Sequence, residues 1–126
     1  MKTNALGRIC EKVVAKWLCQ KGYTVLAKNY LVRGAEIDII ATNADTLIFV
    51  EVKSRHAGYN KEKFRRPAAA VTAIKQKRIV LAAGRFLSEY PSRKRKRFDV
   101  IEVIADEQPE YTSFEIKHIK SAFSAK

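Results

Sequence analysis

Two stretches of the chain carry apolar residues at helical spacing. Apolar positions recur every three or four residues across 5–21, which predicts an amphipathic helix that ends at Lys21-Gly22. A second helix is predicted from Thr72, a candidate N-cap, to about Tyr90. The buried stripe of this second helix is expected at Ile79, Ala83, Phe86, Leu87 and Tyr90.

The remaining apolar segments are short and rich in β-branched residues, which predicts strands. These segments are residues 23–30, 35–41, 47–54, 98–104 and 111–119. The second and third are joined by an Asn/Asp/Thr turn and therefore form a hairpin. The third and fourth flank the second helix, so a crossover connection makes them parallel. The pattern predicts an α/β fold of order αβββαβ plus a short C-terminal strand, with a mixed four- to five-stranded sheet flanked by helices.

Two carboxylates and a lysine, Asp38, Glu51 and Lys53, fall on the predicted hairpin. Because side chains alternate along a strand, Glu51 and Lys53 share one face, and adjacent strands can bring Asp38 beside them. A cation such as Mg²⁺ binds through one or two carboxylates and activates a water for attack on phosphate. A surface Glu–Lys pair is the alternative. The apolar run around Glu51 favours a site, because a buried carboxylate is costly unless it is paired or metal-bound.

Two further glutamates lie near this trio in the predicted structure. Strict alternation along 35–41 puts Glu36 on the face of Asp38, with Ile37 and Ile39 on the opposite face. Glu11 falls at the edge of the apolar arc of the first helix, from which a carboxylate could reach over the sheet. The alternative for Glu11 is a partly exposed side chain paired with a neighbouring lysine.

The net charge of +12 is concentrated in the middle of the chain. Residues 53–97 hold 15 Lys and Arg against two Glu, whereas the remainder holds 10 basic and 11 acidic residues. Such a basic segment next to the carboxylates favours nucleic acid over acidic lipid or protein as the partner. We expect phosphate contacts from a loop at 55–66, from the second helix and from a loop at 93–97. The residues are Arg55, Lys61, Lys63, Arg65, Arg66, Lys75, Lys77, Arg78, Arg93, Lys94, Arg95, Lys96 and Arg97.

Length and composition narrow the class of protein. With 126 residues and 47% hydrophobic positions, residues 1–126 are expected to form one domain with its own core. No apolar run approaches the roughly 20 residues that span a bilayer, and no secretory signal is seen at the N-terminus. Cys10 and Cys19 are too far apart on a helix to bridge, which predicts reduced thiols and a cytoplasmic location. Nothing marks a homodimer interface, so dimerisation stays open.

The ordered series of motifs resembles the restriction-endonuclease-like core of the PD-(D/E)XK superfamily. It is similar, more narrowly, to the YraN-like family of predicted bacterial endonucleases, over nearly the whole chain. The segments that carry the resemblance are Gly7 and Glu11 with AKWL at 15–18, EIDIIA at 36–41, FVEVKSR at 49–55, Lys75 with Arg78, RFDVI at 97–101 and Ala122-Phe123. Cys10 and Ala35 replace glycines of the family pattern, but both are small and lie outside the expected ligands.

The resemblance implies roles for the residues of the trio. Asp38 and Glu51 would be ligands of Mg²⁺ or Mn²⁺, with the Val52 carbonyl as a third ligand. Lys53 would position the attacking water or support the phosphate charge. Glu11 matches the helix glutamate that archaeal Holliday-junction resolvases direct toward the same metal, and it joins the catalytic set on that basis.

Other matched positions receive weaker assignments. Glu36 and Gln76 would lie next to the metal ligands without binding the metal themselves. Arg97 and Asp99 form either a functional pair of unassigned role or a structural ion pair. The implied activity is a metal-dependent endonuclease acting on DNA in preference to RNA, with structure-specific cleavage in repair or recombination. The alternative is a nucleic-acid-binding module that keeps a relic of the nuclease site.

Overall fold

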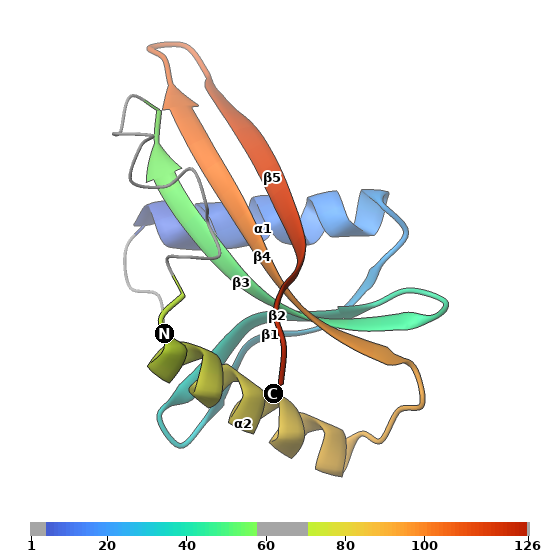
Figure 1. The fold of residues 1–126 in the computed structure, drawn as a ribbon. Helices are drawn as coiled ribbons and strands as arrows, with labels where there is room; N and C mark the ends of the chain where they lie inside the picture. The colour runs from blue at the N-terminus through green and yellow to red at the C-terminus, as the bar shows by residue number, and fades with distance from the viewer. Residues whose placement is uncertain (1–4, 58–70, 126) are drawn as a thin grey trace.

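The computed structural model describes residues 5–57 and 71–125, and these form one five-stranded sheet flanked by two helices. The element order is α1 (Ala5–Gln20), β1 (Thr24–Val32), β2 (Ala35–Thr42), β3 (Thr46–His56), α2 (Ala73–Glu89), β4 (Arg95–Glu107) and β5 (Thr112–Phe123). The strands lie in sequence order across the sheet, with β3 and β4 parallel and the other neighbours antiparallel. This arrangement (Figure 1) confirms the predicted α/β class and the mixed sheet.

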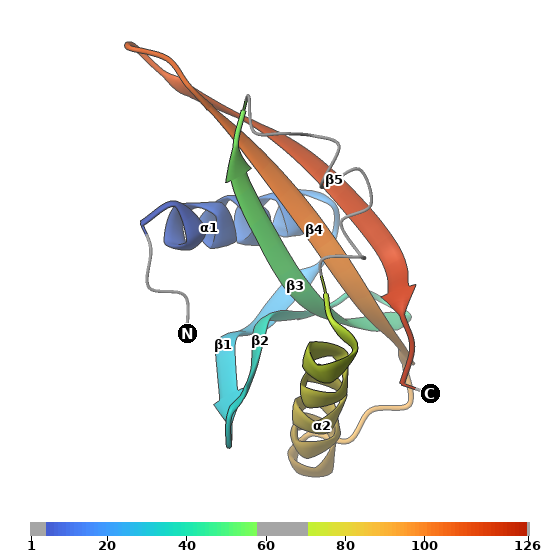
Figure 2. The same cartoon turned by 60° about the vertical axis from the view of Figure 1, so that its left-hand side comes forward.

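Each helix covers one face of the sheet, so the protein has two hydrophobic layers (Figures 1 and 2). The α1-side core is built from Cys10, Val14 and Leu18 of the helix against the even-numbered positions Ile48, Val50 and Val52 of β3. The α2-side core takes the odd-numbered Leu47 and Phe49 of β3 with Ile79, Ala83 and Phe86 of the helix. The alternation of β3 therefore separates the two cores, as a strand that is covered on both faces requires.

The boundaries of α2 follow from its end residues. The Thr72 hydroxyl accepts a hydrogen bond from the Lys75 backbone N–H at 3.1 Å, which confirms Thr72 as the N-cap. Within the predicted stripe, Ile79, Ala83 and Phe86 are buried. The expectation that Tyr90 is buried was wrong: it follows the last helical residue and is 61% exposed, with its ring against Phe86 at 5.0 Å between centroids.

Three strands are longer than their hydrophobic patterns indicate. β3 continues to His56, so Arg55 belongs to a strand and not to a loop. β4 begins at Arg95, so the loop expected at 93–97 was wrong for its last three residues. The C-terminal strand is not short, because β5 runs for 12 residues to Phe123. In each case pairing with a neighbouring strand continues beyond the apolar residues, and the backbone ladder overrides the polarity of the side chains.

β2 departs from strict alternation at Asp38. Ile37 packs in the α2-side core but Ile39 packs in the α1-side core, so the expectation that they share a face was wrong. The register gives the physical reason: β2 pairs with β3 only from Ile39↔Val50 to Thr42↔Leu47, and before Ile39 the two strands part. Asp38 stands at the point where they separate.

Two expectations from composition can be compared with the described residues. No helix in residues 5–57 or 71–125 is long and apolar enough to cross a membrane. Cys10 is buried and Cys19 is exposed, and the structure joins them by no disulfide.

Candidate functional site

Asp38 is held in place by the backbone of the neighbouring strand. Its Oδ2 accepts a hydrogen bond from the Val52 N–H at 2.8 Å, and the residue is only 3% exposed. Because β2 has already left β3 at this point, a side-chain oxygen takes the role that a backbone carbonyl has further along the ladder. The carboxylate is thereby fixed beside the middle of β3.

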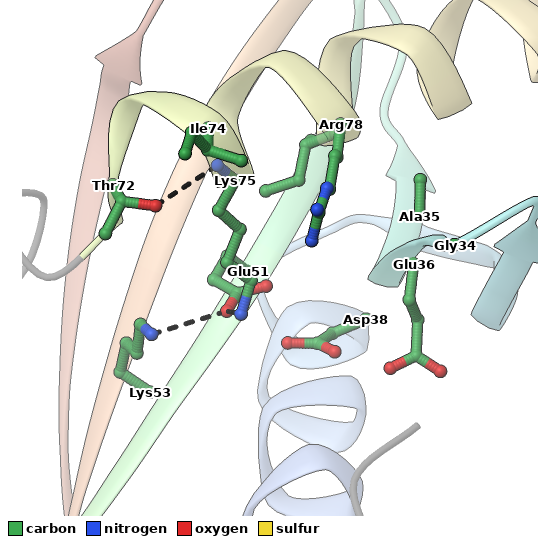
Figure 3. Close-up of a pocket in the computed structure, with 11 residues that line it drawn as sticks. Gly34, Ala35, Glu36, Asp38, Glu51, Lys53, Thr72, Ile74, Lys75 and Arg78 are labelled. Atoms are coloured by element: carbon green, nitrogen blue, oxygen red, sulfur yellow. Dashed lines mark hydrogen bonds and ion pairs between the residues drawn. The ribbon is translucent and has the colours of Figure 1, made fainter.

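Glu51 lies on the α2 side of β3 between two lysines. Its Oε2 is 3.5 Å from Lys53 Nζ and 2.5 Å from Lys75 Nζ (Figure 3). The carboxylate is almost fully buried, whereas both lysine side chains are partly exposed. The sequence prediction that Glu51 and Lys53 share a face is confirmed, since Val50 and Val52 pack in the α1-side core.

These side chains line one pocket of about 480 Å³ between β2, β3 and the first turns of α2. Figure 3 shows Asp38 and Glu51 in its middle, with Glu36 further out along β2. The charged residues of the pocket are Glu36, Asp38, Glu51, Lys53, Lys75 and Arg78. Three acidic and three basic groups therefore face the same space, which is wide enough to admit a phosphate group.

The carboxylates of this pocket act together on Lys75. Burial by itself would lower the pKa of Lys75. The hydrogen bond from Lys75 to Glu51, and the negative charges of Glu51, Asp38 and Glu36, outweigh burial and raise that pKa. The three carboxylates thus favour the charged form of Lys75, whose ammonium lies beside Glu51.

The donor set suits a hard divalent cation. Asp38 and Glu51 offer buried carboxylate oxygens, and Mg²⁺ binds through one or two carboxylates while it keeps several waters. Within residues 5–57 and 71–125, no three His, Cys, Asp or Glu side chains form a group that could hold a metal. Asp38 and Glu51 are the described side chains that would hold such a hydrated cation.

Two expected contributors to the ligand set lie apart from the pocket lining. Glu11 is buried on α1, on the other side of the sheet from α2, and it is not one of the residues that line the pocket. The Val52 side chain packs in the α1-side core, and its backbone N–H serves Asp38. Glu11 and the Val52 carbonyl as metal ligands stay predictions.

Gln76 braces the start of α2. Its Nε2 donates to the Val71 carbonyl at 2.9 Å, and it faces a different hollow, with Lys77 and Val80. Of the two residues expected next to the metal ligands, Glu36 lines the pocket and Gln76 does not.

The basic residues expected to contact phosphate are divided between several places. Lys75 and Arg78 line the pocket, whereas Lys77 faces the hollow beside Gln76. Arg55 is buried, and its Nη2 forms an ion pair with Glu102 Oε2 at 3.3 Å inside the fold. Lys61, Lys63, Arg65 and Arg66 lie outside the described residues.

The basic run at 93–97 lies beside the start of β3, whereas the pocket adjoins the middle of that strand. Arg95 pairs with Thr46, five residues before Glu51, and Arg97 pairs with Ile48, so these arginines lie about 16 and about 10 Å from Glu51 along the strand. Lys94 Nζ donates to the Thr42 hydroxyl and the Asn43 carbonyl, at 3.0 and 2.8 Å, and Lys96 Nζ donates to the Ser92 carbonyl. Arg93 and Arg95 are exposed and remain candidates for phosphate contact.

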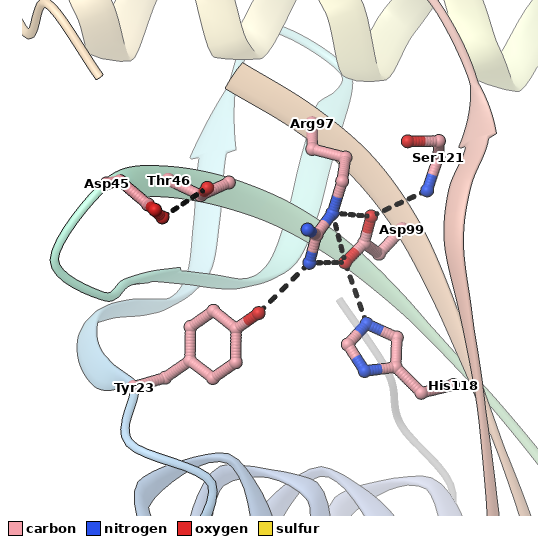
Figure 4. Close-up of polar contacts among 7 residues, drawn as sticks. All are labelled: Tyr23, Asp45, Thr46, Arg97, Asp99, His118 and Ser121. Carbon is pink, nitrogen blue, oxygen red and sulfur yellow. Dashed lines mark hydrogen bonds and ion pairs between the residues drawn. The ribbon is translucent and has the colours of Figure 1, made fainter. Parts of the chain in front are cut away.

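Arg97 and Asp99 belong to a structural cluster on the α1 side of the sheet (Figure 4). Arg97 donates from Nε and Nη2 to the fully buried Asp99 carboxylate, each at 2.9 Å, and from Nη2 to the Tyr23 hydroxyl at 3.0 Å. His118 Nε2 lies 2.7 Å from Asp99 Oδ2, and the Ser121 N–H donates to Oδ1 at 3.0 Å. Sequence reasoning found the Arg97–Asp99 pair but not His118 or Tyr23, whose distance along the chain gives no local signal.

The hydrogen bonds of this cluster keep Asp99 ionised. Burial would raise the pKa of Asp99, but donors from His118, Arg97 and Ser121 outweigh burial and lower it. In turn, the hydrogen bond to Asp99 raises the pKa of Arg97. The cluster ties β4, β5 and the residue before β1 together, and Arg97 and Asp99 form an ion pair within it.

Comparison with known proteins places the site within a matched region. A model described as "Uncharacterised protein family UPF0102" matches residues 10–103, which include every residue of the pocket. A UPF0102 protein of Prosthecochloris aestuarii is 45% identical over 123 residues, covering 95% of this chain and 94% of its own. One from Chlorobium phaeobacteroides is 43% identical over 121 residues, with 94% and 93% covered. One from Rhodococcus opacus is 38% identical over 121 residues, with 94% and 96% covered.

Proposed function

The chain belongs to the uncharacterised protein family UPF0102, and from that premise we propose that it is a Mg²⁺- or Mn²⁺-dependent endonuclease that hydrolyses phosphodiester bonds in DNA. This membership agrees with the resemblance to YraN-like proteins found in the sequence. The observation that carries the proposal is the pocket in which the buried carboxylates of Asp38 and Glu51 face Lys53 and Lys75.

Each residue of the trio has a role in this chemistry. Asp38, oriented by the Val52 N–H, and Glu51 would hold the cation with their carboxylate oxygens. A bound Mg²⁺ or Mn²⁺ polarises the phosphoryl oxygen and lowers the pKa of a water ligand. Lys53 Nζ, which lies 3.5 Å from Glu51, would orient the attacking water or stabilise the charge that develops on the phosphate.

The nucleic acid would be held by the exposed basic side chains around the pocket. Arg78 lines the pocket beside Lys75 and can contact a phosphate next to the one that is cleaved. Because the resemblance includes archaeal Holliday-junction resolvases, branched DNA is the substrate to test first, and a role in repair or recombination is part of the proposal. DNA is favoured over RNA on the same ground.

A second candidate function is a nucleic-acid-binding module without catalysis. The observation that favours it is the ion pairing of Glu51 with two lysines, which already neutralises the carboxylate within the protein. In such a module the pocket would be a relic, and affinity would come from the basic residues alone. Metal binding separates the two candidates.

The test is a calorimetric titration of Mn²⁺ into the full-length protein at moderate salt. The nuclease proposal expects a single site that is lost in both Glu51→Gln and Asp38→Asn. Glu110→Gln, a matched change at an exposed residue before β5, should bind Mn²⁺ as the wild type does. Wild-type affinity in Glu51→Gln and Asp38→Asn would show that these carboxylates do not form the metal site.

A further inference from the structure

The first turn of α2 brings a second lysine, outside the Glu-x-Lys motif, onto the catalytic glutamate. Lys75 Nζ lies 2.5 Å from Glu51 Oε2, closer than Lys53 Nζ at 3.5 Å. The Lys75 backbone is fixed, because its N–H donates to the N-cap Thr72. Its side chain is 45% exposed, and it extends from α2 to the buried Glu51 carboxylate (Figure 3).

The position of this ammonium conflicts with the proposed metal. Among the described residues, Glu51 and Asp38 are the carboxylates in the middle of the pocket, and Mg²⁺ binds an oxygen ligand at about 2.0–2.1 Å. A divalent cation at that distance and an ammonium in contact with the same oxygen would repel each other, because the Glu51 carboxylate is almost fully buried and its surroundings screen charge less than bulk water does. A metal that binds Glu51 through Oε2 therefore competes with Lys75 for the same oxygen.

We propose that Lys75 is a displaceable counter-ion: it occupies the cation position beside Glu51 until a divalent metal replaces it, and the released ammonium then binds a phosphate of the nucleic acid. The proposal rests on the proposed function, because it requires Asp38 and Glu51 to bind metal. It assigns Lys75 as a positioning residue that acts on the metal site through Glu51.

The side chain is suited to both positions. Lysine carries a compact charge on a flexible stem of four carbons, and the exposed part of Lys75 leaves room for the ammonium to move without a change in α2. Arg78, one turn further along α2, lines the same pocket, so a released Lys75 stays beside a second phosphate-binding group. Metal binding and phosphate binding should therefore favour each other, since each makes use of the same movement of Lys75.

The experiment compares Mn²⁺ affinity in wild type, Lys75→Met and Lys77→Met, measured by calorimetry on the full-length protein. Lys77 is the matched control, because it has the same charge two residues away on the same helix but does not line the pocket. Removal of the competing ammonium should tighten Mn²⁺ binding about tenfold in Lys75→Met, whereas Lys77→Met should stay within about twofold of wild type, an effect of overall charge alone.

The outcomes separate this inference from the function on which it rests. Equal affinities in Lys75→Met and Lys77→Met, with binding still abolished by Glu51→Gln, would overturn the counter-ion role and leave the metal site standing. No Mn²⁺ binding in wild type or Lys75→Met would overturn both. Thermal unfolding gives a second measure, because Mn²⁺ should raise the Tm of Lys75→Met more than that of Lys77→Met at the same metal concentration.

Discussion

Asp38 has a structural task in addition to its proposed role as a ligand, and the two tasks respond differently to substitution. Its Oδ2 is the acceptor for the Val52 N–H at the point where β2 leaves β3. Val52 is completely buried, and its N–H donates to the Asp38 carboxylate. Asp38→Ala removes the acceptor together with the charge, whereas Asp38→Asn removes the charge and keeps an oxygen that can accept the same hydrogen bond.

The expected difference in stability follows from that one hydrogen bond. Leaving a buried N–H without an acceptor costs about 1–3 kcal/mol, so Asp38→Ala should lose about 2 kcal/mol of unfolding free energy. Asp38→Asn replaces a charged acceptor by a neutral one and should lose less than about 1 kcal/mol. For a chain of this length, each kcal/mol corresponds to roughly 3–6 °C in Tm.

Chemical denaturation followed by circular dichroism, with thermal unfolding alongside, measures both variants against wild type. Glu110→Ala at an exposed position serves as the control and should unfold as the wild type does. The reasoning would be refuted if Asp38→Ala were as stable as Asp38→Asn. Both variants should lose Mn²⁺ binding, so Asp38→Asn is the better probe of the metal site because it leaves the strand contact intact.

Three further outcomes test other parts of the structure. Burial would raise the pKa of Asp99, but its hydrogen bonds hold that pKa below its usual value of about 3.9, so the stabilisation from the ionised carboxylate is present above pH 4 and is lost as pH falls through the lowered pKa. Asp99→Asn should therefore lose about 3–5 kcal/mol of unfolding free energy at pH 7 and flatten the acid side of the Tm–pH curve. An unchanged acid side would count against the cluster. Arg55→Met should lose about 3 kcal/mol of unfolding free energy, because it removes the ion-pair partner of the buried Glu102. The double variant Arg55→Met/Glu102→Leu should recover most of that loss in chemical denaturation, and no recovery would mean that the ion pair does not explain it. Arg78→Ala should reduce the slope of log affinity for DNA against log salt by about one unit, and an unchanged slope would remove Arg78 from the phosphate contacts.

The parts of the fold set by local pattern were predictable from the sequence. Helical periodicity and the Thr72 cap gave α2, and the alternation of β3 placed Glu51 and Lys53 on one face. The helix between β3 and β4 required a crossover and therefore a parallel pair. These features depend on neighbours in the chain, so the sequence carries them directly.

The parts that depend on distant neighbours were not predictable in the same way. The position of Asp38 depends on where β2 parts from β3, and strict alternation misassigned Ile37 and Ile39 for that reason. The basic character of Arg55 indicated a surface residue, but its partner Glu102 comes from the adjacent parallel strand.

Lys75 shows the same difficulty within the pocket itself. Sequence reasoning placed it among the phosphate contacts, and its contact with Glu51 appears only when the crossover lays the start of α2 beside β3. Long-range pairing of this kind determines which of several basic residues can act at the site.

Cleavage of DNA by the purified full-length protein tests the central proposal most directly. End-labelled branched, nicked and single-stranded DNA, with a matched RNA, would be incubated with Mn²⁺ or Mg²⁺ and with wild type, Asp38→Asn, Glu51→Gln, Lys53→Met and Glu110→Gln. We expect metal-dependent cleavage of DNA by wild type and Glu110→Gln, slower cleavage by Lys53→Met, and none by Asp38→Asn or Glu51→Gln. Cleavage at wild-type rates by Asp38→Asn and Glu51→Gln would contradict the assignment of this pocket as the active site.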